Sequence, residues 1–189
     1  MATKRIAVTI QGQSPLLMHQ FPMIQVEVIE KLSAAEQAEL AAYRDPEGRL
    51  YVPGLNLQRA CVAGATFSKG KGRASLQKSA AACLVVTPEY VLLGQDTYAI
   101  DAWPVAVPAT KGRILRYRLR FETWVLTFEL EYDTALLSDV QVRRIVDDTG
   151  SRVGLLDFRP ERKGPFGRFV VTHWDDGGGP GGYWRRSGT

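Results

Sequence analysis

The sequence has few of the residues that metal centres, disulfide scaffolds and membrane spans require. Its 189 residues include two cysteines, Cys61 and Cys83, and two histidines, His19 and His173. Two cysteines make neither a disulfide framework nor a four-ligand zinc site, and the two histidines lack the spacing of metal ligands. No apolar run approaches the roughly 20 residues of a transmembrane helix, and none near the N-terminus has signal-peptide length. The sequence predicts a cytoplasmic protein with no metal, no cofactor and no membrane contact.

Acidic residues are absent from two long stretches, Gly48–Pro88 and Ala102–Phe121, although the net charge is only +4. The basic residues in these two stretches include Arg59, Lys69, Lys71, Arg73, Arg113, Arg116, Arg118 and Arg120. Segregated charge of this kind is typical of a face that binds a polyanion. Solvated strands and loops can also give this pattern by chance.

The apolar pattern predicts a mixed arrangement of helices and strands. Arg5–Gln11 and Trp124–Glu131 alternate as half-buried strands do. Ser138 is predicted to cap a helix that runs to Thr149, with Gly150 as the residue just after its end. In chain order the main elements read β-α-β-β-α-β, which predicts an α+β, ferredoxin-like fold with insertions, as in RNA-recognition motifs. The sequence predicts one such domain over residues 1–175 and a glycine-rich, flexible tail over residues 176–189.

The insertion after the first strand has two predicted parts. Phe21–Ile29 is apolar, but Pro22 interrupts it, so we expect a loop or a short extended segment. Ser33–Tyr43 is predicted to be a helix, because Ser33 followed three residues later by Glu36 forms a capping box.

The most specific motif is GLLDFRPERKGPFGRF, residues 154–169, between the last predicted helix and the last predicted strand. Glycines let backbone amides approach a phosphate, and arginine supplies forked donors to it. The Gly-Lys-Ser/Thr ending of a nucleotide P-loop is absent, and the loop precedes a strand rather than a helix. The motif predicts a site for nucleic-acid phosphates formed by Arg159, Arg162, Lys163, Gly164, Gly167 and Arg168. A long loop that only packs Phe158 and Phe166 is the alternative.

This motif resembles the glycine-rich signature of the RAMP superfamily, the repeat-associated mysterious proteins of CRISPR antiviral systems. The likeness is strongest to the crRNA-binding backbone subunit of effector complexes. SPLLMH at 14–19 is similar to the turn after the first strand of that family, and YVPGLNLQR at 51–59 to the entry into its first helix. RLRF at 118–121 and Trp124 resemble the strand before its second helix. The sequence also resembles small phage-encoded proteins that share the DFRP…GPFGRF ending.

The resemblance implies a ferredoxin-like core that binds guide or single-stranded RNA along its phosphate backbone. It also implies a head-to-tail homo-oligomer, with other effector subunits as further partners. The residues that the resemblance places along the RNA groove are Asn56, Arg59, Lys69, Lys71, Arg73, Arg159, Arg162, Lys163 and Arg168. The second acid-free stretch adds Arg113, Arg116, Arg118 and Arg120 to the predicted interface. Trp103 or Tyr117 would stack on bases, unless they pack in the core or in an interface.

The sequence therefore supports three alternative functions. The first is a non-catalytic subunit that binds single-stranded nucleic acid, with RNA preferred over DNA, and polymerises along it. The second is a metal-independent endoribonuclease of the same superfamily, for which His19 is a weak candidate for the general base. The third is a phage structural or assembly protein that self-associates through its β edges and binds no nucleic acid. The basic row at 116, 118 and 120 argues mildly against the third.

Overall fold

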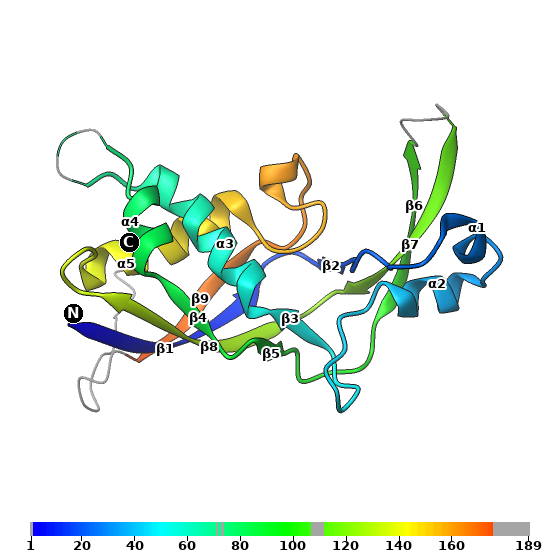
Figure 1. Cartoon of the computed structure of the whole chain (residues 1–189), viewed down its shortest axis with the longest axis horizontal. Coiled ribbons are helices and arrows are strands. Elements are labelled where there is room, and N and C mark those ends of the chain that lie inside the picture. Colours follow the sequence, from blue (N-terminus) through cyan, green and yellow to red (C-terminus); the bar gives the residue numbers. More distant parts are fainter. Residues whose placement is uncertain (1, 71, 73, 107–111, 176–189) are drawn as a thin grey trace, which may run out of the picture.

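The computed structural model describes residues 2–70, 72, 74–106 and 112–175. Two predicted site residues, Lys71 and Arg73, and the predicted tail at 176–189 lie outside the described residues. The molecule is elongated, with the largest sheet and its helices at one end and a long β-hairpin with two short helices at the other (Figure 1).

The main sheet has four antiparallel strands in the order β4-β8-β1-β9. They are β1 (Thr3–Gly12), β4 (Val85–Thr87), β8 (Val125–Asp133) and β9 (Phe169–Asp175). Two helices, α3 (Gly54–Gly64) and α5 (Asp139–Asp148), lie on the same face of this sheet (Figure 1). α3 connects β1 to β4 and α5 connects β8 to β9, which is the β-α-β-β-α-β connection. The predicted α+β, ferredoxin-like fold is confirmed.

One face of the sheet is apolar and the other is polar. On the covered face Val8 lies opposite Phe128 and Ile10 opposite Leu126, and all four side chains are buried. On the open face the hydroxyl groups of Thr9 and Thr127 hydrogen bond to each other at 3.0 Å. The alternation in the sequence therefore predicted these strands correctly, because successive side chains of a strand point to opposite faces.

α5 begins at the predicted cap, and a further helical turn follows its end. The Ser138 hydroxyl accepts a hydrogen bond from the backbone N–H of Gln141, whose side-chain oxygen accepts one from the Ser138 N–H. The helix continues into a π-helical turn, Thr149–Val153, and the chain turns away at Gly154, whose φ is +73°. The α-helix itself ends at Asp148 with Thr149 as its C-cap, within one residue of the prediction, but Gly150 lies inside the π-helical turn and does not end the helical segment. A Cβ at Gly150 would lie 2.2 Å from the carbonyl oxygen of Phe169, so this glycine allows close packing on β9.

A second sheet, in the order β2-β7-β6, lies beyond the main one. Its strands are β2 (Leu16–Met18), β6 (Ala99–Ala106) and β7 (Arg113–Phe121), and β6 and β7 form the hairpin that projects in Figure 1. α2 (Ala34–Leu40) begins at the predicted Ser33–Glu36 capping box and packs on β7. α1 (Val26–Ile29) replaces part of the segment expected to be extended, because Pro22 precedes the helix rather than interrupting it.

The remaining elements position the first turn of α3. β3 (Tyr51–Pro53) pairs with β5 (Tyr90–Leu92) and leads directly into α3. α4 (Gln77–Cys83) and single 3-10 turns at Ala65–Phe67 and Pro160–Arg162 complete the described elements. No described helix is long and apolar enough to cross a membrane.

Candidate nucleic-acid interface

The glycine-rich loop, defined here as residues 154–168, is held against the turn that follows β1. The backbone N–H of Asp157 donates to the carbonyl of Leu17 at 3.0 Å, and that of Gly167 donates to the carbonyl of Pro15 at 2.8 Å. The backbone N–H of Arg168 donates to the Ser14 hydroxyl at 3.0 Å. Two segments that the sequence singled out, 14–19 and 154–169, therefore lie side by side. In Figure 1 the loop lies between α3 and the β6–β7 hairpin.

Glycines allow this loop to fold back on itself. A Cβ at Gly164 would lie 1.7 Å from the carbonyl oxygen of Phe158. Gly167 has a φ of +71°, and a Cβ there would lie 2.2 Å from the carbonyl oxygen of Leu155. The rings of Phe158 and Phe166 are 6.1 Å apart. The glycines thus have a packing role in the loop, as the alternative interpretation of the motif expected.

Gly164→Ala is expected to lower the free energy of unfolding by about 1–3 kcal/mol, because the added methyl group forces the loop apart. Gly70→Ala is the matched control, since the nearest atom to its Cβ belongs to the flexible end of Leu76, at 3.0 Å. That variant should stay within about 0.5 kcal/mol of the wild type. Urea unfolding followed by circular dichroism measures both. Equal stability of the two variants would contradict this account of the loop.

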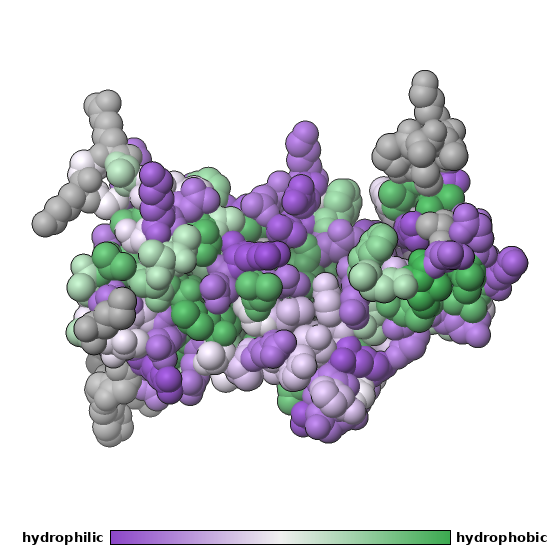
Figure 2. Space-filling model, in the orientation of Figure 1, coloured by the Kyte–Doolittle hydropathy of each residue, from purple (hydrophilic) through white to green (hydrophobic). Residues whose placement is uncertain are grey.

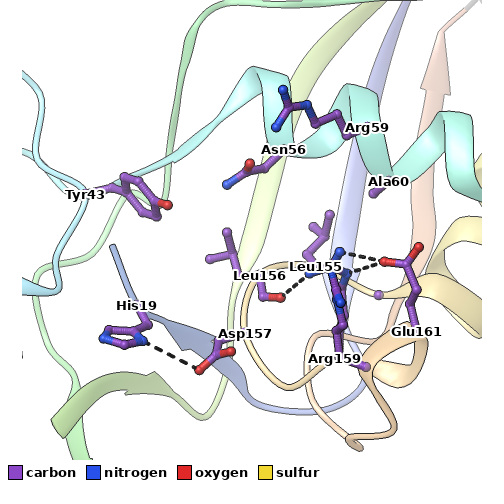
Figure 3. A pocket seen from close by; sticks show the side chains of 12 residues that line it. His19, Tyr43, Asn56, Arg59, Ala60, Leu155, Leu156, Asp157, Arg159 and Glu161 are labelled. Atoms are coloured by element: carbon purple, nitrogen blue, oxygen red, sulfur yellow. Dashed lines mark hydrogen bonds and ion pairs between the residues drawn. The ribbon is translucent and has the colours of Figure 1, made fainter. Parts of the chain in front are cut away.

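A first hollow, which we term the helix pocket, lies between α3 and the glycine-rich loop and has a volume of about 410 Å³. Asn56 and Arg59 extend from α3 on one side, while Asp157 and Arg159 belong to the loop on the other (Figure 3). α3 begins at Gly54, and its N-cap residue, Pro53, makes no side-chain capping hydrogen bond. The residues that line the helix pocket are His19, Tyr43, Asn56, Arg59, Ala60, Gly154, Leu155, Leu156, Asp157, Arg159, Glu161 and Arg162.

A second hollow, the hairpin pocket, lies between the β6–β7 hairpin and the same loop and has a volume of about 420 Å³. Its lining residues are His19, Trp103, Pro104, Val105, Arg116, Arg118, Asp157 and Phe158. His19 and Asp157 line both pockets, so the two hollows adjoin at this pair. The structure thereby places side chains from α3, the loop and the hairpin along one groove.

Asp157 is the centre of a charged network between the two pockets. Nη1 of Arg118 donates to Oδ2 of Asp157 at 2.7 Å, and Nη2 of Arg118 donates to Oδ2 of Asp101 at 2.5 Å. Nδ1 of His19 lies 4.0 Å from Oδ2 of Asp157. The neighbours of Asp157 in the chain, Leu156 and Phe158, have φ values of +58° and +47°. Left-handed backbone at such residues is costly, so the packing around Asp157 fixes its position.

The environment of His19 makes the stability of the fold depend on pH. Burial lowers the pKa of His19; the Asp157 carboxylate opposes this shift, and the charges of Arg116 and Arg118 add to it. A histidine whose pKa is lower in the folded state binds its proton more readily when unfolded. Stability is therefore complete above the unfolded pKa of about 6.5 and falls as the pH drops below it.

Between about pH 7 and pH 5, the wild type should lose more unfolding free energy than His19→Gln, which carries no titrating group at this position. The measurement is urea unfolding at several pH values. His173→Gln is the control, because it makes the same substitution at an exposed position on β9. Parallel pH profiles of the wild type and His19→Gln would contradict this prediction.

The predicted basic residues divide by whether they already have a partner. Arg59, Arg116 and Arg162 line the pockets, and their guanidinium groups have no ion pair or hydrogen bond with any residue that the structure describes. Three further cations without such partners in the described chain lie outside the pockets: Lys69 in the loop after α3, Arg113 at the start of β7, and Lys163 in the glycine-rich loop. Free guanidinium groups beside a pocket are available to phosphate.

The other predicted arginines are engaged within the protein. Arg159 pairs with Glu161 at 2.6 Å, Arg168 donates to the carbonyl of Ser151 at 3.1 Å, and Arg120 pairs with Glu122 at 2.6 Å. Arg120 also lies over the ring of Phe166, 5.5 Å from its centroid. Arg118 is only 6% exposed and is bonded to two carboxylates, so we leave it out of the interface.

Sequence reasoning missed the residues that organise the groove. Asp157 lay inside the quoted motif, but nothing in the sequence predicts that it meets Arg118, which is 39 residues away. Tyr43, which lines the helix pocket, was placed only at the end of a predicted helix. The Arg118–Asp157 contact and the position of Tyr43 in the helix pocket both bring together elements that are distant in the chain. Local sequence patterns contain no signal for either of them.

Within residues 2–70, 72, 74–106 and 112–175, no group of three or more histidine, cysteine or acidic residues could hold a metal ion. Cys61 is buried, and burial raises the pKa of its thiol to about 12, which leaves it protonated and unreactive. The two pockets are lined by guanidinium groups, aromatic rings, the amide of Asn56 and the His19–Asp157 pair.

No protein-family model matches the sequence, and no curated protein matches it. Among solved structures, the chain is similar to a chain in the cryo-EM structure of the Type III-B Cmr-beta bound to cognate target RNA. The alignment covers 92% of this chain with a TM-score of 0.55 and 12% sequence identity. It covers 60% of that chain, so this protein spans less than two thirds of its neighbour. At this identity the likeness shows a shared fold.

Proposed function

We propose that this protein is a non-catalytic subunit that binds single-stranded nucleic acid, with RNA preferred, and polymerises along it as in CRISPR-type effector complexes. The observation that carries the proposal is the convergence of Arg59, Arg116 and Arg162, each without a partner among the described residues, on two adjoining pockets. Guanidinium groups along a groove neutralise successive phosphates of a strand. The fold shared with a chain of the Type III-B Cmr-beta structure bound to cognate target RNA is consistent with this role.

The open face of the main sheet is a less suitable surface for RNA. RNA-recognition motifs stack bases on aromatic residues of this face. Here the outward residues of β1 and β8 are Thr3, Arg5, Ala7, Thr9, Gln11, Val125, Thr127, Glu129, Glu131 and Asp133, and none of these is aromatic. Arg5 is already paired with Glu131 at 2.5 Å. The groove beside the glycine-rich loop is therefore the favoured site.

Assembly is part of the proposal. One groove covers only a few nucleotides, so coverage of a longer strand needs several subunits. A head-to-tail contact that does not close on itself builds a helix along such a strand. Other effector subunits are further candidate partners for the ends of this assembly.

The test is binding of the wild-type protein to a labelled single-stranded RNA, with the matching DNA strand and an RNA duplex as competitors. The affinity for RNA should fall steeply between about 50 and 200 mM salt. Light scattering should show oligomers whose size grows with RNA length. A protein that is oligomeric after nuclease treatment and binds no strand at any salt concentration would instead support the structural or assembly function.

A second candidate is favoured by one observation, the proximity of His19 and Asp157. A neutral imidazole beside a carboxylate in a groove is an arrangement that can remove a proton from a ribose hydroxyl. Incubation of end-labelled RNA with the protein in the presence of EDTA tests this role. Our proposal predicts intact RNA. Cleavage that is lost in His19→Ala and kept in His173→Ala would establish a metal-independent endoribonuclease.

A further inference from the structure

The hairpin pocket has an aromatic wall that the phosphate contacts do not use. Trp103 on β6 is 52% exposed, and its ring lies 6.3 Å from that of Phe158 in the glycine-rich loop. Phe158 in turn contacts Phe166, which lies beneath the guanidinium group of Arg120. Trp103 is therefore the exposed end of a continuous series of contacting side chains. The loop supports this ring from behind while leaving much of its surface open to the solvent.

A free cation lies directly beside this aromatic surface. Trp103 and Arg116 are partners in the register of β6 and β7, so their side chains are on the same face of the hairpin. The Arg116 guanidinium group has no partner among the described residues. Pro104 and Val105 contribute apolar surface to the pocket, and His19 and Asp157 supply polar atoms. An aromatic ring next to an arginine matches the two parts of a nucleotide, the base and the phosphate.

The size of the pocket agrees with a small planar ligand. Its volume of about 420 Å³ is within the range of about 300–1,000 Å³ that small-molecule sites have. A core aromatic would be covered by apolar side chains, whereas Trp103 faces a hollow lined in part by the charged and polar side chains of Arg116, Asp157 and His19. This combination favours a nucleobase over an apolar peptide side chain.

The geometry points to the hairpin pocket as a site for one unpaired nucleobase of the bound strand, stacked on Trp103, with the adjoining phosphate on Arg116. This inference rests on the proposed function and adds a base-contacting site to it. Stacking on an aromatic face is tolerant of sequence, because every base has such a face. The polar groups of His19 and Asp157 lie where the edge of the base would be, between the two pockets.

The test compares Trp103→Ala and Trp103→Phe in binding to a short oligouridine. Trp103→Ala should weaken binding roughly 5- to 150-fold, which is the effect of losing one stacked base. Trp103→Phe should restore most of the affinity, because a phenyl ring keeps the stacking surface. Ile100→Ala is the matched control, since Ile100 is 43% exposed on the other face of the same strand. That variant should bind as the wild type does.

Heparin separates base stacking from charge, because it is a polyanion without bases. Trp103→Ala should bind heparin as well as the wild type does. Equal affinities of Trp103→Ala and the wild type for oligouridine would overturn the base site while leaving the proposed function intact. Failure of the wild type to bind oligouridine would overturn both. Equal losses of oligouridine and heparin binding in Trp103→Ala would show that Trp103 only supports the fold, and would also overturn the base site.

Discussion

Replacing Arg59, Arg116 and Arg162 together by alanine should weaken binding of a single-stranded RNA about 100-fold at moderate salt. The reason is that three guanidinium groups without internal partners would each lose a phosphate contact, at roughly 1 kcal/mol per contact. The dependence on salt should change as well. For single strands, the slope of log K against log salt falls by about 0.7 for each phosphate contact, so the triple variant should lose about two units. Fluorescence anisotropy across a salt series measures both quantities.

The matched control removes the same amount of charge from arginines that are already engaged. Arg120 and Arg159 are paired with glutamates, and Arg168 donates to a backbone carbonyl. Their triple alanine variant should lose less than about 10-fold in affinity, because these guanidinium groups have less free capacity for phosphate. Thermal melting confirms that both triple variants remain folded. Equal losses in the two variants would show that only net charge matters and would contradict a localised groove.

The contrast between these two sets of three arginines shows what the sequence could predict and what it could not. Segregated charge and the glycine-rich motif placed Arg59, Arg116 and Arg162 in the predicted interface, and the fold brings them to adjoining pockets. The same pattern selected Arg118 and Arg159, because a sequence shows charge but does not show partners. Arg118 meets Asp101 across the hairpin and Asp157 from the loop, and only the tertiary structure creates both contacts.

The sequence predicted the elements of the fold more accurately than the residues of the site, for a related reason. Strand alternation, the capping box at Ser33 and the cap at Ser138 are local patterns, and each is confirmed by the strand or the cap that it indicated. Gly150 follows the C-cap of α5 as predicted, but its small size also serves a contact with β9, which is distant in sequence and which no local pattern indicates. Local sequence patterns predict helices, strands and caps. The role of a glycine or a charged residue depends instead on the tertiary contacts that it makes.

Arg118 itself gives the largest expected change in stability. Arg118→Met should lower the free energy of unfolding by about 2–4 kcal/mol, because it leaves the carboxylates of Asp101 and Asp157 without their cation. Asp157 is partly exposed, so water compensates it to some extent, and we place the effect below the largest losses known for buried pairs. Urea unfolding measures the change. Arg116→Met, on the same strand and the same face, is the control and should have little effect.

A double variant distinguishes lost pairing from lost packing. Arg118→Met combined with Asp101→Asn removes the more buried unpaired charge, so it should recover part of the stability that Arg118→Met loses. If the loss came only from poor packing of methionine, the second substitution would recover nothing.

The network also joins the hairpin to the glycine-rich loop, so Arg118→Met should weaken RNA binding even under conditions where the protein is fully folded. Unchanged binding there would mean that the two walls of the hairpin pocket keep their positions without the network.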